Sequence, residues 1–198
     1  MKCKVFDDMF DELYLHEIYN KILSFPLNLT NVANRKTFPY GNVGSHRLIG
    51  ATVFHRSNMN RIDEYIPDSD WCFDIFEQIE TRIENDLYLE SISLNVQNMG
   101  CDGTTHVDAE ESNEYTLLVM TNPTWKKEWG GEFQLMKEYV NDDNMVLETY
   151  KYVPGRVIIL PGAHPHRGLA PKEKYVYRTS IVYRVRIHDD EDLTYIDS

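Results

Sequence analysis

The triplet His106-Val107-Asp108, which follows a glycine-containing turn, is the first candidate for a metal or catalytic site. Residues i and i+2 of an extended chain project to the same side, so the His106 imidazole and the Asp108 carboxylate can hold one metal ion together. Alone the triplet is weak evidence, because 7 His and 32 acidic residues in 198 positions supply about one such triplet by chance. A second copy, His188-Asp189-Asp190, has no strand or histidine after it and is interpreted as part of a solvated tail.

The order of the features that follow raises the first triplet above chance. They are a predicted strand, Gly130-Gly131-Glu132, another strand, the segment Pro161-Gly162-Ala163-His164-Pro165-His166, and Arg178-Thr179-Ser180. A histidine from a distant strand would complete one face of a metal ion. Two imidazoles and one carboxylate are the donor set that holds non-haem Fe(II) and leaves other coordination positions open.

The N-terminal part predicts two amphipathic helices that could support such a site. Apolar residues from Phe6 to Phe25 recur at helical spacing, and Pro26 ends the segment. A second helix is predicted from about Ser69 to Leu87, since Pro67-Asp68-Ser69-Asp70 offers side chains that commonly begin helices. The segment between them, Asn28 to Ser57, contains proline and several glycines and is predicted as loop with short strand pieces.

After Leu87 the pattern changes to short β-rich segments separated by turn residues, which is typical of an antiparallel sandwich or barrel. The predicted strands are Tyr88–Gln97, Tyr115–Asn122, Glu132–Met136, Met145–Val153, Arg156–Leu160 and Val176–Ile187. Helices followed by strands predict an α+β protein built on a jelly roll. We expect a single domain over residues 1–198, with helical support over 6–87, a core over 88–187 and a partly ordered acidic tail over 188–198.

Composition argues against several classes of partner and location. A balance of 20 Lys+Arg against 32 Asp+Glu gives a net charge of −12, which repels phosphate backbones, so nucleic acid is a disfavoured partner. Apolar runs are far shorter than the roughly 20 residues of a membrane span, and no signal segment is recognised. The cysteines Cys3, Cys72 and Cys101 form no CxxC pair, and their odd number would leave one unpaired in an oxidising compartment. These features predict a cytoplasmic protein away from membranes.

The order HxD, GGE, PGRVIILPG, PHRG and RTS over about half the chain resembles the Fe(II)/2-oxoglutarate dioxygenases, and within them the prolyl 4-hydroxylase-like branch. The resemblance implies a double-stranded β-helix (jelly-roll) core with the N-terminal helices packed on it. It implies Fe(II) held by His106, Asp108 and His166, with Arg178 binding the distal carboxylate of the cosubstrate 2-oxoglutarate. It further implies that O₂ is used to hydroxylate a substrate C–H bond, with release of succinate and CO₂.

The chemistry of the side chain also supports the assignment of Arg178, and two histidines compete for the third metal position. The guanidinium fork of Arg178 can hold a carboxylate through two parallel bonds, and Ser180 projects from the same strand face toward the same carboxylate. His164 is the alternative third ligand, because it lies two residues from His166 and would project to the same side. The family pattern commonly has proline directly before the ligand, and Pro165-His166 matches that pattern.

The chain departs from the family at the tyrosine that many prolyl hydroxylases use to reach the cosubstrate, since the aligned positions are Val96 and Met120. Polar residues on strands expected to border the metal are candidates to replace it, namely Asn95, Gln97 and Thr116. Asn34 to Arg61 and Glu110 to Glu114 are candidate lids over the substrate. The substrate is expected to be a protein or peptide side chain, proline first, or a small metabolite. A non-catalytic jelly-roll binding module and a cupin-like metal protein are the alternatives.

Overall fold

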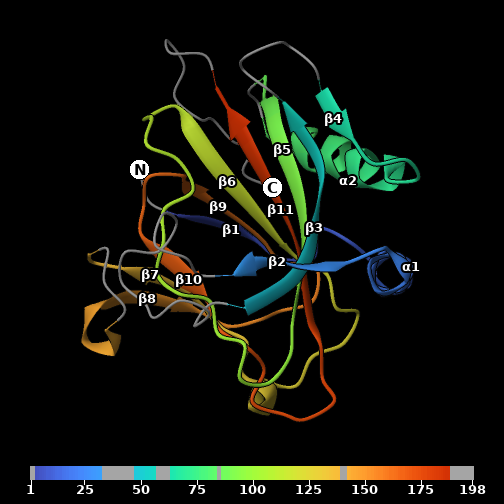
Figure 1. The fold of residues 1–198 in the computed structure, drawn as a ribbon. Coiled ribbons are helices and arrows are strands. Elements are labelled where there is room, and N and C mark those ends of the chain that lie inside the picture. The colour runs from blue at the N-terminus through green and yellow to red at the C-terminus, as the bar shows by residue number, and fades with distance from the viewer. Residues whose placement is uncertain (1–2, 33–46, 57–62, 84–85, 139–141, 188–198) are drawn as a thin grey trace.

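The computed structural model describes residues 3–32, 47–56, 63–83, 86–138 and 142–187 (Figure 1). These residues form mostly β-sheet together with two helices, α1 and α2. The elements in chain order are β1 (Lys4–Phe6), α1 (Glu12–Ser24), β2 (Asn28–Val32), β3 (Arg47–Arg56), β4 (Asp63–Tyr65), α2 (Asp70–Glu80), β5 (Tyr88–Gln97), β6 (Glu114–Met120), β7 (Phe133–Met136), β8 (Val146–Tyr150), β9 (Val157–Pro161), β10 (His166–Gly168) and β11 (Arg178–Arg186).

The strands form two antiparallel sheets. The large sheet has the order β1-β9-β6-β11-β5-β3-β2, with β4 paired to the edge of β3, and the small sheet has the order β10-β7-β8. Strand β11 lies between β5 and β6, with Val182 opposite Ser93 on one side and Leu118 on the other. This register aligns the pocket-side residues of three strands in rows across the sheet.

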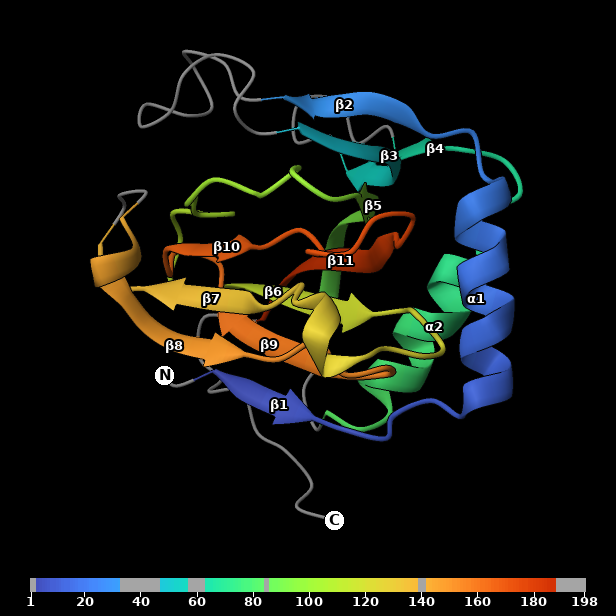
Figure 2. The ribbon, with the colours of Figure 1, turned by 90° about the horizontal axis from the view of Figure 1, so that it is seen from below.

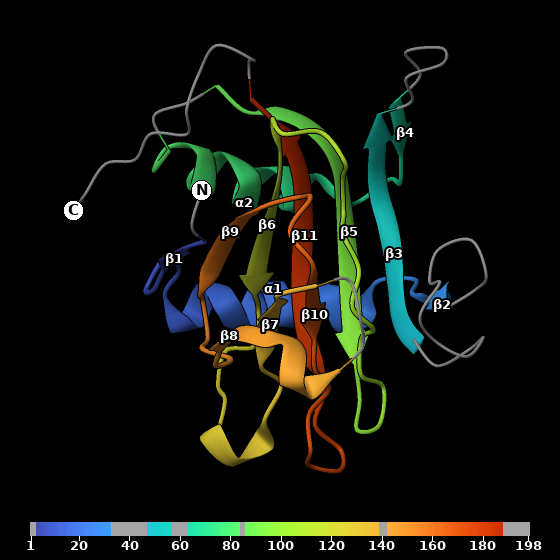
Figure 3. The same cartoon turned by 90° about the vertical axis from the view of Figure 1, so that its left-hand side faces the viewer.

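The large sheet lies between the helices and the small sheet. Figure 2 shows α1 and α2 on one side of the molecule and β7, β8 and β10 on the other, and Figure 3 shows the small sheet in front of β11. Side chains alternate between the two faces of a strand, so the large sheet presents one face to the helices and the opposite face to the small sheet. No helix in the described ranges has the length and apolarity that a membrane crossing requires.

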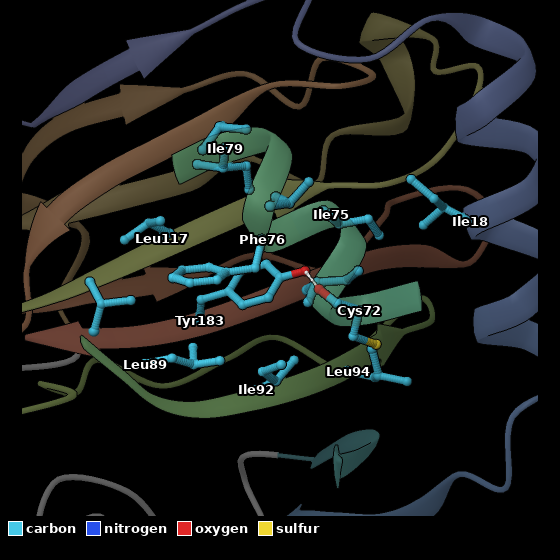
Figure 4. Close-up of a cluster of buried hydrophobic side chains, with 14 of the residues drawn as sticks. Ile18, Cys72, Ile75, Phe76, Ile79, Leu89, Ile92, Leu94, Leu117 and Tyr183 are labelled. Carbon is cyan, nitrogen blue, oxygen red and sulfur yellow. Dashed lines mark hydrogen bonds between the residues drawn. The ribbon is translucent and has the colours of Figure 1, made fainter. Parts of the chain in front are cut away.

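The helix-side face of the large sheet is part of the main apolar core (Figure 4). The Tyr183 hydroxyl on β11 donates to the Cys72 carbonyl of α2 over 2.8 Å, and the Tyr183 ring lies 5.4 Å from the ring of Phe76. Fully burying an Ile or Leu side chain contributes about 1.5–3 kcal/mol, and Ile75, Ile92 and their neighbours are fully buried here. This core packs against the helix-side face of β11. The opposite face of β11 lines the candidate site described below.

Both helices are shorter than the sequence predicts. The predicted first helix begins at Phe6, but Phe6 pairs with Val157 of β9, and α1 begins only after Asp11, whose side chain accepts the backbone N–H of Tyr14. An N-cap aspartate of this kind sets a helix start that apolar spacing alone does not locate. The second helix ends at Glu80, although Leu87 beyond it is still buried in the core.

The segment predicted as loop contains β3, a strand of ten residues. Gly50 indicates a turn in the sequence, but a Cβ at this position would lie 2.2 Å from the Leu94 carbonyl oxygen. Glycine is therefore required because β3 approaches β5 closely, and it does not interrupt the strand. Each of the six predicted strands corresponds to an observed strand, and β5 has the predicted bounds.

Candidate metal centre

Backbone hydrogen bonds bring the histidines of the candidate site together from distant parts of the sequence. His106 and His166 exchange both backbone N–H···O bonds, at 3.0 and 2.9 Å, in an isolated antiparallel bridge. The Asp108 N–H donates to the Gly162 carbonyl over 2.8 Å, which holds the triplet beside the end of β9. As a result, one ligand atom from each of His106, Asp108 and His166 lies within 4.8 Å of the others.

Each histidine has its ring orientation set by a backbone carbonyl. His106 Nδ1 lies 2.8 Å from the Thr104 carbonyl oxygen, and His166 Nδ1 lies 2.8 Å from the His164 carbonyl oxygen. Because a carbonyl only accepts, each Nδ1 must carry a hydrogen, which leaves a lone pair on each Nε2. The Nε2 atoms of His106 and His166 lie 3.6 and 3.4 Å from the Asp108 carboxylate. A second bond that fixes the tautomer in this way is usual for metal-ligating histidines.

Electrostatics favour a neutral His106 imidazole beside an ionised Asp108 carboxylate. Burial and the neighbouring His166 lower the pKa of His106 to about 4. Burial opposes the charge on Asp108, but the neighbouring His166 ring and the Arg184 guanidinium outweigh it and hold the pKa of Asp108 well below its usual value. The Thr116 hydroxyl and Arg184 donate to the two carboxylate oxygens, over 2.7 and 2.8 Å. These are the protonation states that a divalent metal requires of its ligands.

The two candidate third ligands differ in position. In the described part of the chain, the group of metal-capable side chains contains His166, and His164 is outside it. His164 contributes its backbone carbonyl to the orientation of the His166 ring. The His166 ring also packs 5.4 Å from the ring of Phe133 on β7, so the small sheet supports it from the side.

A cavity of about 370 Å³ lies between the two sheets and includes the three grouped side chains. Alternate residues of β11 line it, as the two-residue period of a strand predicts, whereas Thr179, Ile181 and Tyr183 face away from it. The residues predicted to bind cosubstrate all line this cavity: Asn95, Gln97, Thr116, Arg178 and Ser180.

Arg178 lies at the closed end of the cavity with only 2% of its surface exposed. Its Nε donates to the Gly131 carbonyl over 3.0 Å, and its Nη1 donates to Gln97 Oε1 over 2.8 Å and lies 3.4 Å from Ser180 Oγ. Its Nη2 is buried without a hydrogen-bond partner. An unsatisfied buried donor on a charged group costs at least ~1–3 kcal/mol, so this atom indicates a site for an anionic ligand.

The Gly130-Gly131 pair sets the acceptor for Arg178. Gly131 has φ of +77°, and a Cβ on it would lie 2.8 Å from the Trp125 ring. Trp125 is held in turn by its indole N–H, which donates to the Gly130 carbonyl over 2.9 Å. Glycine therefore allows the turn to pass between Trp125 and Arg178 while its carbonyl faces the guanidinium.

Two of the predicted cosubstrate contacts have their polar atoms engaged with other site residues. Gln97 donates to the Cys101 and Gly168 carbonyls over 2.9 and 3.1 Å while its oxygen accepts from Arg178. Thr116 donates to Asp108. These bonds make Gln97 a positioning residue for Arg178 and Thr116 a positioning residue for Asp108. Ser180, next to Arg178, and Asn95 remain placed for direct contact with a ligand.

The two positions aligned with the tyrosine of the prolyl hydroxylases do not line the cavity. Val96 lies in the helix-side core, and Met120 lies in the apolar cluster between the two sheets. Tyr152 was not predicted as a site residue, and nothing in its local sequence indicates such a role. The centroid of its ring lies 5.3 Å from the Arg178 guanidinium carbon. Sequence reasoning also missed Arg184, which the period of β11 could have indicated, because it follows Arg178 and Ser180 on the same face.

Of the two candidate lids, only the second lies entirely within the described residues. Most of Asn34 to Arg61 lies outside the described residues, and its described portion, β3, contributes Leu48, Ala51, Thr52 and His55 to the cavity wall. From the second candidate, Glu110 to Glu114, Glu114 lines a neighbouring cavity. The tail predicted over 188–198 also lies outside the described residues.

Comparison with known proteins adds structural likeness at low sequence identity. No protein-family model matches the chain, and no curated protein matches its sequence. Its structure is similar to an oxidoreductase of the 2OG-Fe(II) oxygenase family from Burkholderia pseudomallei, with TM-score 0.64 and 16% identity, covering 93% of this chain and 84% of that one.

Two prolyl hydroxylase structures are also similar. The viral collagen prolyl hydroxylase of Paramecium Bursaria Chlorella virus-1, in its 2OG complex, has TM-score 0.58 and 12% identity, covering 94% of this chain and 96% of that one. The prolyl hydroxylase from Trichoplax adhaerens, in complex with a hypoxia inducible factor peptide fragment, has TM-score 0.56 and 16% identity, covering 93% of this chain and 83% of that one. The chain therefore has the jelly-roll fold of the 2OG-Fe(II) oxygenases, at identities that carry the fold alone.

Proposed function

We propose that this protein is an Fe(II)- and 2-oxoglutarate-dependent oxygenase that hydroxylates a C–H bond of its substrate. One observation carries the proposal: a His-Asp-His group and a buried arginine with an unpartnered Nη2 line the same cavity. The first suits a metal, and the second suits a carboxylate. The likeness to oxygenase structures, one of them a 2OG complex, supports the same proposal.

The donor set fits Fe(II). His106 and His166 would bind through Nε2, and Asp108 would bind through one carboxylate oxygen while its other oxygen keeps a hydrogen bond. Two imidazoles and one carboxylate on one face leave positions for a chelating cosubstrate and O₂. Thiolates are absent from the described group, which argues against a structural zinc or iron–sulfur site.

The closed end of the cavity fits the distal carboxylate of 2-oxoglutarate. Arg178 Nη2 has no partner of its own, and the Ser180 hydroxyl lies beside the same guanidinium. Gly168 borders this space, since a Cβ added to it would be only 3.6 Å from Nη2. The cavity volume of about 370 Å³ falls within the range of small-molecule sites.

When bound, iron and 2-oxoglutarate supply the oxidising chemistry, in which O₂ and 2-oxoglutarate yield succinate and CO₂ while a substrate C–H bond becomes C–OH. The residues of the chain bind and orient. Arg178 and Ser180 hold the cosubstrate carboxylate, and Thr116 holds Asp108 in its ligating position. Leu118, Val182 and Phe133 line the cavity with apolar surface, which limits the access of water.

We further propose a protein or peptide side chain, with proline first, as the substrate. The support is the likeness to prolyl hydroxylases, one of which is seen with a peptide fragment. A small metabolite is the second candidate, and it is supported by the likeness to the 2OG-dependent carbocyclase SnoK of nogalamycin biosynthesis.

The test is an anaerobic titration of the protein with Fe(II) and then with 2-oxoglutarate. The account predicts the weak visible charge-transfer band of the iron chelate, and it predicts succinate once O₂ is admitted. His106→Ala should abolish both, whereas Arg178→Met should weaken 2-oxoglutarate binding and leave Fe(II) binding unchanged. Tight metal binding without the band or succinate would refute the oxygenase and favour a binding module.

A further inference from the structure

A second arginine stands on the cavity face of β11, at the opposite end from Arg178. Arg184 lies opposite Ser91 of β5 and Thr116 of β6, so it belongs to a row of polar residues across the sheet. Arg184 lies six positions after Arg178 along the strand, which corresponds to about 20 Å between their Cα atoms. Unlike the buried Arg178, Arg184 keeps 48% of its side-chain surface exposed.

Arg184 stands where the metal-side cavity meets a second cavity. The second cavity has a volume of about 280 Å³ and includes Glu90, Glu114 and Arg186. The two cavities share His55, Ser91, Asp108, Thr116 and Arg184 in their linings. The Arg184 side chain therefore borders the junction between the second cavity and the grouped His and Asp side chains.

The other arginines at this end are already engaged. Arg186, two residues further along β11, lies 3.3 Å from a Glu90 carboxylate oxygen and 3.2 Å from one of Glu114. Arg56 donates to the Leu89 carbonyl and stacks 4.3 Å from the Tyr88 ring centroid. The charge of each therefore has a partner within the fold, although Arg186 Nε is buried without a hydrogen-bond partner.

Arg184 differs because the acid it contacts in the described part of the chain is Asp108, the proposed metal ligand. A divalent cation at the His-Asp-His group would draw on the charge of that carboxylate, and Arg184 would then have no acid of its own. Its exposure also makes the present pair with Asp108 weak. Arg184 thus offers a cation with free donors at the mouth of a polar cavity, in a chain whose net charge of −12 otherwise repels anions.

We propose that Arg184 binds a carboxylate of the substrate, so that the site selects molecules with a carboxylate close to the carbon that reacts. The proposal rests on the proposed function, because it takes the reacting carbon to lie beside the metal. Arg184 Nη2 lies 2.8 Å from Asp108 Oδ1, and a metal on that oxygen adds only ~2.1 Å, so only a few bonds can separate the carboxylate from the reacting carbon. Ser91, Ser93 and Thr52 supply hydroxyls along the same wall.

The test uses the protein loaded with Mn(II) and saturating 2-oxoglutarate, and it measures paramagnetic relaxation of acetate methyl protons. Acetamide is the neutral probe of the same shape. We expect acetate to be relaxed strongly in the wild type, about tenfold less in Arg184→Gln and partly less in Arg184→Lys, since a hydrogen bond to a charged group accounts for a change of that size. Arg186→Gln, the matched control, should stay within about twofold of wild type, because Arg186 is already paired.

Equal relaxation of acetate in the wild type and Arg184→Gln, or equal relaxation of acetate and acetamide in the wild type, would overturn the carboxylate site. The protons of 2-oxoglutarate give an internal reading, because their failure to relax in the wild type would refute the proposed function instead. A peptide with a single glutamate then identifies the source of the carboxylate. Relaxation of its glutamate protons indicates an acidic protein segment, and relaxation of acetate alone indicates a small carboxylic acid.

Discussion

Gln97→Glu is the substitution that most sharply tests how the Arg178 end of the cavity works. Glutamate has nearly the shape of glutamine, so one carboxylate oxygen can keep the bond that Oε1 now accepts from Arg178 Nη1 at 2.8 Å, while the other replaces Nε2 and loses its bonds to the Cys101 and Gly168 carbonyls. The substitution places a carboxylate about 5 Å from the carboxylate expected at Nη2. At an effective dielectric constant near 20, this repulsion amounts to ~3 kcal/mol, or roughly a 200-fold weaker affinity for 2-oxoglutarate.

The assay is an anaerobic titration of 2-oxoglutarate into the Fe(II)-loaded protein, with Fe(II) affinity measured separately. Fe(II) binding should stay unchanged, because the hydrogen bonds of Gln97 go to the Cys101 and Gly168 carbonyls and to Arg178. Gln134→Glu is a matched control, since Gln134 accepts from Arg167 Nε over 2.8 Å and does not line the metal-side cavity. A 2-oxoglutarate affinity in Gln97→Glu within about threefold of the control would refute the assigned carboxylate site.

Three further predictions test the site and the fold. His164→Ala should retain metal binding that His166→Ala loses, measured by Fe(II) titration. Tyr183→Phe removes the hydrogen bond to a buried helix carbonyl and should lower the free energy of unfolding by about 1–2 kcal/mol in urea without changing metal affinity. A hydrogen bond from Arg156 lowers the pKa of Asp7 below its usual 3.8, so Asp7→Asn should reduce thermal stability at neutral pH, and the difference should vanish as pH falls through the folded-state pKa of Asp7.

The fold was predictable where the sequence carries a local pattern. The β-rich composition of Tyr88–Gln97 located β5 with its observed bounds, and the turn residues between the later segments located the other core strands. Short strands were missed because a three-residue strand such as β1 or β10 has no period of its own and forms by pairing with a partner distant in sequence. Gly50 indicated a loop because its reason, the approach of Leu94, is tertiary.

The candidate site was likewise predictable only where residues lie close together in the sequence. His106 and Asp108 could be paired from their i, i+2 spacing, and Arg178 and Ser180 could be assigned to one face by the same rule. The sequence could not show that Gln97 binds Arg178, because that bond also depends on the position of the Gly168 carbonyl.

The most direct measurement is a crystal structure of the protein with Mn(II) and 2-oxoglutarate. We expect a metal bound by His106 Nε2, one Asp108 oxygen and His166 Nε2, with the distal carboxylate of 2-oxoglutarate on Arg178 Nη2 and Ser180 Oγ. A metal bound by His164 in place of His166, or a cosubstrate carboxylate away from Arg178, would contradict this expectation.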